Sequence, residues 1–92
     1  MNNTFLDALE AAHRARTGVF CYVATLRIRP NTWGLSIVER NVDGHFPVSE
    51  DYFLGPQEAA QREAATLNSS RLGLTEREAA RIVASSMTGG CR

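Results

Sequence analysis

The chain has 92 residues, which is enough for one domain (1–92) and leaves little room for a deep catalytic cleft. Ten arginines balance ten acidic residues, so the formal net charge is zero, which argues against a general nucleic-acid-binding protein because such proteins need a basic surface. The hydrophobic content of 43% is ordinary for a globular protein and argues against a disordered one.

The charges are unevenly distributed along the chain. Residues 41–63 hold five acidic residues and one arginine, a net charge of −4, and the segments on either side each have a net charge of +2. All ten basic residues are arginine. Guanidinium groups suit two-pronged contacts with phosphate or carboxylate. A GC-rich coding sequence would produce the same composition, and it is the favoured explanation.

Residues 4–16 are predicted to form a helix. The apolar positions recur with helical spacing, Thr4 and Asp7 match a capping box, and Gly18 suits the C-terminal cap. His13 falls at the edge of the apolar stripe, where a half-buried packing histidine is expected more often than a catalytic one.

Two strands are predicted next, at 19–29 and 33–41, and both alternate with period two. Between them, PNTW (30–33) suits a four-residue loop built on a type I turn, because proline excludes a two-residue type I′ turn. Folding the strands together at this turn pairs core positions with core positions, which sets the register. The core face would hold Phe20, Tyr22, Ala24, Leu26, Ile28, Trp33, Leu35 and Ile37.

A third strand is predicted at 45–53 after the Asp43-Gly44 turn, with Phe46 and Val48 facing the core. Pro47 indicates an edge strand or an irregularity, because proline donates no ladder hydrogen bond.

Two helices complete the chain. One follows Gly55-Pro56 and buries a stripe of Ala60, Ala64 and Leu67. The other begins with a capping box formed by Thr75 and Glu78, and its buried side is expected to hold Ala79, Ile82, Val83 and Met87.

The sequence therefore predicts an α+β fold, a three-stranded antiparallel sheet with helices packed on one face, in the order α-β-β-β-α-α. The opposite face would stay open, and it would carry Thr25, Arg27, Arg29, Ser36, Val38, Arg40 and Ser49.

The sequence contains no compact catalytic set. Cys21 and His13 would be a nucleophile and a base, but they fall on an outward strand face and a helix edge, and nothing orients the imidazole. With Cys91 and His45 they give four potential metal ligands, whose spacing matches no known ligand pattern. We therefore expect a protein that is not an enzyme, with no metal, cofactor or small-molecule substrate. A minor hydrolase is the third alternative.

The element order α-β-β-β-α is similar to a double-stranded RNA-binding domain, with LGPQEAAQREAATLN (54–68) in the place of that family's second helix. That family needs a lysine cluster at the start of this helix, and here the helix carries Glu58 and Glu63. The resemblance implies a related topology. It makes a small nucleic-acid-binding regulator that uses the open sheet face the alternative function.

A contact surface is the remaining class of site, since arginine and tryptophan are enriched where protein interfaces are most sensitive to truncation. Trp33 is assigned to the core because its alternation agrees with Leu35. For the arginines, a contact and a solvated face are equally favoured. The candidate partner-binding residues are Arg27, Arg29, Asn31, Arg40, Asp43, Glu50 and Asp51.

In its size, neutral charge and αβ character, the chain resembles the type I-F anti-CRISPR proteins, which are small phage-encoded inhibitors. The resemblance implies a non-enzymatic protein that binds the Cascade (Csy) surveillance complex and blocks target DNA binding. The arginines would then meet guide-RNA phosphates or acidic groups of Cas proteins. The acidic residues would meet the basic surfaces that normally hold DNA.

The location is expected to be the host cytoplasm, with no membrane partner. Residues 1–16 lack the basic and apolar regions of a signal peptide, and no apolar run reaches the length of a membrane span. The two cysteines form no disulfide framework, so reduced thiols are expected.

Overall fold

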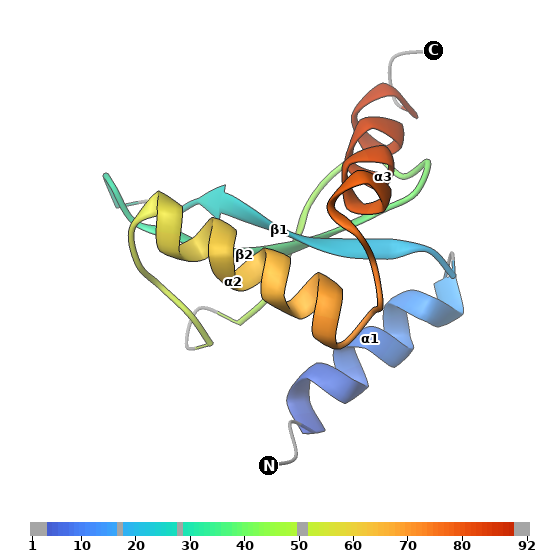
Figure 1. Cartoon of the computed structure of the whole chain (residues 1–92), viewed down its shortest axis with the longest axis horizontal. Helices are drawn as coiled ribbons and strands as arrows, with labels where there is room; N and C mark the ends of the chain where they lie inside the picture. Colours follow the sequence, from blue (N-terminus) through green and yellow to red (C-terminus); the bar gives the residue numbers. More distant parts are fainter. Residues whose placement is uncertain (1–3, 17, 28, 50–51, 90–92) are drawn as a thin grey trace.

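The computed structural model describes residues 4–16, 18–27, 29–49 and 52–89, which form three helices and a three-stranded antiparallel sheet (Figure 1). The predicted α+β class and element order are confirmed. In chain order the elements are α1 (Thr4–Arg16), β1 (Phe20–Leu26), β2 (Trp33–Glu39), β3 (Phe46–Pro47), α2 (Gln57–Ser70) and α3 (Glu76–Gly89).

The register between β1 and β2 is the predicted one. Tyr22 lies opposite Ile37 and Ala24 lies opposite Leu35, so core positions face core positions along the hairpin. Both strands are shorter than predicted: β1 ends at Leu26 and β2 ends at Glu39. Ile28, which was expected to face the core, lies outside the described residues.

The hairpin turn differs in type from the prediction. The N–H of Thr32 donates to the carbonyl of Arg29 (3.2 Å), which places Pro30 and Asn31 at the two central positions. Asn31 has a φ of 59°. A positive φ at the second central position is a feature of type II turns and not of type I turns.

The third strand is much shorter than the predicted 45–53. Only Phe46 and Pro47 form the paired strand, and Val48 adds one further hydrogen bond from its N–H to the carbonyl of Leu35 (2.9 Å). The chain returns to the sheet at Gly55, whose N–H and C=O both bond to Trp33 (2.9 and 2.7 Å). β2 is therefore the central strand, and β1 forms the opposite edge of the sheet.

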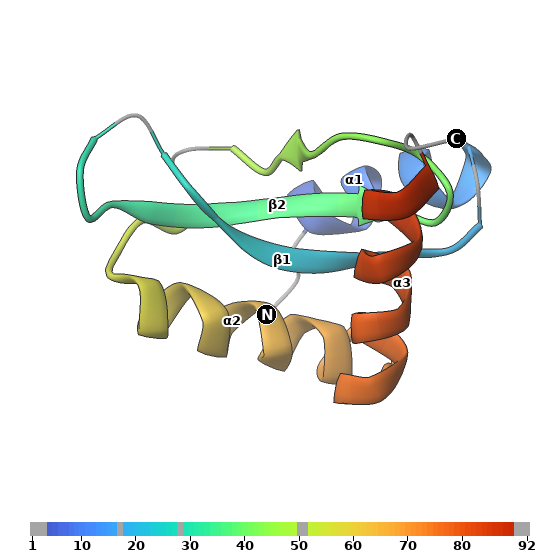
Figure 2. The same ribbon diagram turned by 90° about the horizontal axis from the view of Figure 1, so that it is seen from above.

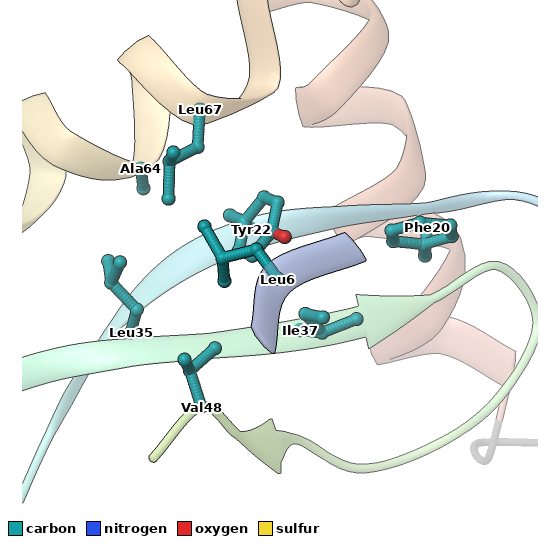
Figure 3. Close-up of a cluster of buried hydrophobic side chains, with 8 residues drawn as sticks. All are labelled: Leu6, Phe20, Tyr22, Leu35, Ile37, Val48, Ala64 and Leu67. Atoms are coloured by element: carbon teal, nitrogen blue, oxygen red, sulfur yellow. The ribbon is translucent and has the colours of Figure 1, made fainter. Parts of the chain in front are cut away.

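The main core lies between the sheet and the helices α1 and α2. Figure 3 shows Ala64 and Leu67 of α2 directed toward Tyr22 and Leu35, with Leu6 of α1 beside them. These side chains are at most 6% exposed. The small alanines allow α2 to approach closely, and Figure 2 shows it running beside β1, on the side of the sheet away from β3.

The third helix departs from the predicted arrangement, in which the helices share one face. Ile82 of α3 packs against Cys21 and Val38, which alternate with the main-core residues and so belong to the opposite face. Both side chains are fully buried. α3 crosses the strands near the end of β2 (Figure 2). It covers one half of a face that was expected to be open.

The capping box that was predicted for the last helix is confirmed. The hydroxyl of Thr75 accepts from the N–H of Glu78 (3.1 Å), and the Glu78 carboxylate accepts from the N–H of Thr75 (2.9 Å). Leu74, immediately before this box, packs against the cluster beneath α3. The capping box and Leu74 therefore fix the point after α2 at which α3 begins, and from there α3 crosses to the second face of the sheet.

Candidate functional site

The half of the second sheet face that α3 leaves uncovered is polar. We call it the open half-face, and it consists of Thr25, Arg27, Gly34 and Ser36, next to the hairpin turn. Thr25 on β1 and Ser36 on β2 are diagonal neighbours, since Thr25 pairs with Gly34 and Ser36 pairs with Val23, and their hydroxyls share a hydrogen bond of 2.7 Å. Their pairing provides a polar floor at the centre of this surface.

The side chain of Arg27 is fixed across this floor. Its Nη1 donates to Thr25 Oγ1 (3.2 Å) and Ser36 Oγ (3.3 Å), and its Nη2 donates to the carbonyls of Leu35 and Val48. Among the described residues no acidic side chain pairs with it. Nε is buried and has no hydrogen-bond partner there. The guanidinium is therefore held in one orientation by neutral groups, and its positive charge stays at the surface of the sheet.

Gly34 makes this placement possible. A β-carbon at Gly34 would lie 2.9 Å from Cζ and 2.8 Å from Nη2 of Arg27. Both separations are too short for any side chain to share the space. The guanidinium thus occupies the position that a side chain on β2 would normally fill.

The other predicted contact residues do not form one surface with Arg27. Arg29 and Asn31 are exposed at the hairpin turn, close to the open half-face. Arg40 pairs with Val19, eight residues before Arg27 on the same ladder, which puts the two arginines about 26 Å apart. Asp43 is exposed in the turn after β2. Glu50 and Asp51 lie outside the described residues.

Arg40 lies in a different setting, at the end of the sheet that α3 covers. It lines a hollow of about 330 Å³ together with Glu78 and Arg81 of α3. The predicted set is therefore divided between two ends of the molecule, and the structure places only Arg29 and Asn31 near Arg27.

A second surface, which the sequence did not indicate, lies beside the edge strand. We call it the edge groove. It has a volume of about 980 Å³ and runs along β1 between α2 and α3. Its floor includes Tyr22, Val23 and Ala24, and its walls include small side chains from both helices: Ala64, Ala65, Ala79 and Ala80.

Asn68 of α2 closes one end of the edge strand. Its Oδ1 accepts from the N–H of Tyr22 (2.7 Å), and its Nδ2 donates to the carbonyl of the same residue (3.0 Å). This pair of bonds copies what a neighbouring strand would make. Asn68 is 6% exposed, so the amide is a buried part of the fold. In the sequence, Asn68 is one polar residue in an alanine-rich helix, and nothing in that pattern predicts that it bonds to the edge strand.

Two buried carboxylates attach α1 to the sheet and to α2. Glu39 is fully buried, and it lies 2.6 Å from Nδ1 of His13 and accepts from Nε of Arg16 (3.0 Å). The His13 ring packs edge-on against Phe46. Alternation along β2 places Glu39 on the same face as Leu35 and Ile37, and that pattern could have revealed a buried acid.

The second carboxylate is Glu10. It accepts from the Tyr22 hydroxyl (2.7 Å) and from Nε of Arg71 (2.7 Å), and Arg71 also bonds to Asp7. Burial, followed by the hydrogen bond to Glu10, raises the pKa of the Tyr22 phenol above its usual range. Hydrogen bonds to Glu10 and Asp7 raise the pKa of Arg71. Each polar group in this network has a partner, which is typical of a structural network.

Cys21 and His13 are not brought together. Cys21 lies beneath α3, and burial raises the pKa of its thiol to about 12. Its Sγ donates to the carbonyl of Ala79 (3.7 Å). His13 lies on α1, against the opposite face of the sheet. A nucleophile needs the thiolate and a base within hydrogen-bond reach, and this geometry provides neither for Cys21.

Within the described parts of the chain, no three His, Cys, Asp or Glu side chains are grouped so that they could hold a metal ion. The helices described there are all too short or too polar to cross a membrane. In comparisons with protein-family models, curated proteins and solved structures, nothing matches this chain. Its candidate sites are therefore defined by the geometry described above.

Proposed function

We propose that this protein acts by binding a macromolecular partner through the open half-face, as a phage-encoded inhibitor of the type I-F Cascade (Csy) surveillance complex. The observation that supports this proposal is the fixed guanidinium of Arg27. Neutral hydrogen-bond partners hold it flat on the sheet, and exposed Arg29 follows two residues later. A preorganised cation loses little conformational entropy on binding, which favours affinity.

The chemistry of this surface fits a phosphate or a carboxylate. The exposed guanidinium of Arg29 can bind either group by planar, two-pronged hydrogen bonds, and Arg27, whose Nη groups already donate within the protein, adds positive charge beside it. Guide-RNA phosphates and acidic side chains are the two such groups on a Csy complex. Because the chain has no net charge, a local pair of arginines on a neutral protein favours a specific docking site over general attraction to nucleic acid.

The test uses purified type I-F surveillance complex and labelled target DNA. The full chain, added in stoichiometric amounts, is expected to form a complex that survives gel filtration and to reduce DNA binding. Arg29→Glu reverses the charge of an exposed residue beside Arg27, and we expect it to weaken inhibition by at least about tenfold. Arg77→Glu is the matched control, because Arg77 is exposed at the start of α3, away from the open half-face.

Three results would contradict parts of this proposal. No association with the assembled complex would exclude the named partner. Equal inhibition by both variants would exclude the open half-face as the contact. Binding of free duplex RNA by the chain alone, with steep salt dependence, would favour the nucleic-acid-binding regulator.

A further inference from the structure

The edge strand β1 has backbone groups that no element of the sheet uses. The N–H of Arg27 donates to Thr32 (2.8 Å), and the carbonyl of Val19 accepts from Arg40 (3.0 Å). In an antiparallel ladder, hydrogen-bonded and non-bonded pairs alternate. The odd-numbered residues of β1 therefore bond to β2, and the N–H and C=O of the even-numbered ones point away from it.

Asn68 occupies these outward groups at Tyr22, and Ala24 is the next outward residue along the strand. Ala24 lies on the floor of the edge groove. Leu26 follows at the open end of β1 and is 58% exposed. The groove thus contains the part of the strand edge that Asn68 leaves uncovered.

The walls of the groove have room for a backbone. Alanine side chains of α2 and α3 line its two walls, on either side of β1. The charged residues of the lining are Arg62 on the α2 wall and Glu76 on the α3 wall. A floor that offers backbone donors and acceptors between walls of methyl groups is the arrangement found where an extended peptide adds to a sheet edge.

We propose that the edge groove binds an extended peptide segment of a partner protein, which pairs with β1 at Ala24 and Leu26 as an added strand. Asn68 ends the pairing at Tyr22, so the peptide is held at the hairpin end of the strand. This site is separate from the open half-face, and it does not depend on the function proposed above.

A second copy of this chain fits the groove less well than a flexible peptide. A second copy would offer two sheet edges: β1, which is flanked by its own α2 and α3, and β3, which is only two residues long. Two β1 edges that each lie at the bottom of a groove cannot approach to the spacing of about 5 Å that strand pairing requires. A peptide without flanking helices has no such obstacle.

The test is selection of random phage-displayed peptides on the folded full chain, followed by affinity measurement with the selected synthetic peptide. Methylation of alternate peptide nitrogens removes the donors on one edge of an extended strand. We expect one of the two methylated registers to lose at least about tenfold in affinity and the other to keep it. The amide of Ala24 should exchange at least about tenfold more slowly when the peptide is bound.

Matched variants test the location. Ala80→Trp fills the groove from an exposed position on α3 and is expected to abolish peptide binding. Ala11→Trp places the same side chain on an exposed position of α1, outside the groove, and should leave binding unchanged. Ala24→Pro removes an outward N–H at an edge position, where proline is tolerated, and should also weaken binding.

The proposal would be overturned if every selected peptide bound Ala80→Trp as well as it binds the wild type, or if no peptide was selected. Equal affinity of both methylated registers would overturn the strand pairing. Concentration-dependent dimerisation that Ala80→Trp abolishes would replace the peptide with a second copy. Arg29→Glu should bind the peptide as the wild type does, so failure of this site and failure of the open half-face can be distinguished.

Discussion

Arg27 lies flat over Gly34, and the missing side chain at Gly34 is what gives the guanidinium its place on the sheet. Gly34 itself is buried beneath it. A flexible side chain on one strand and a glycine on its partner together create the ordered part of the open half-face.

Replacing Gly34 with alanine should displace the Arg27 guanidinium without unfolding the sheet. The three atoms nearest to the added β-carbon all belong to the guanidinium end of Arg27, a flexible side chain that can move. Loss of the hydrogen bonds to Thr25 and Ser36 should lower the free energy of unfolding by about 1 kcal/mol. Urea denaturation measures this change, and the NMR signal of Arg27 Nε–H reports the displacement.

The same substitution separates structure from function. If the open half-face is the contact surface, Gly34→Ala should weaken partner binding although residue 34 has no side chain to contribute. Arg27→Lys is the companion variant, because it keeps the charge and removes the planar fork. An unchanged Arg27 Nε–H signal in Gly34→Ala would contradict the packing described here.

Asn68→Ala should destabilise the protein by about 2 kcal/mol, because it removes two buried hydrogen bonds at the edge of β1. Ser69→Ala, at the adjacent exposed position of α2, should change stability by less than about 0.5 kcal/mol. Amide exchange at Tyr22 should accelerate in Asn68→Ala and stay slow in Ser69→Ala. Unchanged exchange at Tyr22 would exclude Asn68 as the cap of this strand.

The sequence predicted the parts of the fold that follow from local periodicity. Alternation in β1 and β2 gave the register, and Thr75 with Glu78 gave the start of α3. Periodicity says which face of an element is apolar but not which surface will cover it, so α3 was expected beside α2. The apolar side chains of Cys21 and Val38 were a signal against a fully open face, since both need a cover.

The candidate sites were harder to predict because they depend on distant partners. Arg27 was correctly placed on the face opposite the main core, but its contact with Val48 and its fit over Gly34 involve three separate strands or segments. Asn68 acts on Tyr22, which is 46 residues away in sequence. No local pattern encodes such a pairing.

The buried carboxylate of Glu39 should be strongly coupled to His13. Removing one partner of a buried pair leaves an uncompensated polar group, so Glu39→Ala should cost about 3–5 kcal/mol. His13→Ala in that background should cost less than it does alone, with a coupling energy of at least about 1 kcal/mol. Urea denaturation of the four proteins in this double-mutant cycle measures the coupling.

An exposed acid provides the control for this cycle. Glu58→Ala on the outer side of α2 should change stability by less than about 0.5 kcal/mol. Strictly additive effects of Glu39→Ala and His13→Ala would show that the two side chains are neighbours without a significant interaction.

Stability should fall at alkaline pH because of Cys21. Burial raises the pKa of this thiol from 9.0 to about 12 in the folded protein, so the unfolded chain releases its proton first. The contribution is fully present below pH 9.0 and is lost as the pH rises toward about 12. The maximum slope is about 1.4 kcal/mol per pH unit for one proton. Tyr22, whose pKa is also raised, should steepen the loss above pH 10.0.

Cys21→Val tests this origin, because valine fits a buried strand position and does not titrate. The urea midpoint is measured from pH 8 to pH 10, about one pH unit on either side of the unfolded thiol pKa. As the pH rises, the midpoint should fall in the wild type and stay nearly constant in the variant. Tyr22→Phe should keep the thiol-dependent fall and reduce the steeper part at higher pH, to which Tyr52, whose pKa is raised by burial, also contributes. If Cys21→Val retained the full slope near pH 9, ionisation elsewhere in the chain would be the cause, and the burial of Cys21 under α3 would not control alkaline stability.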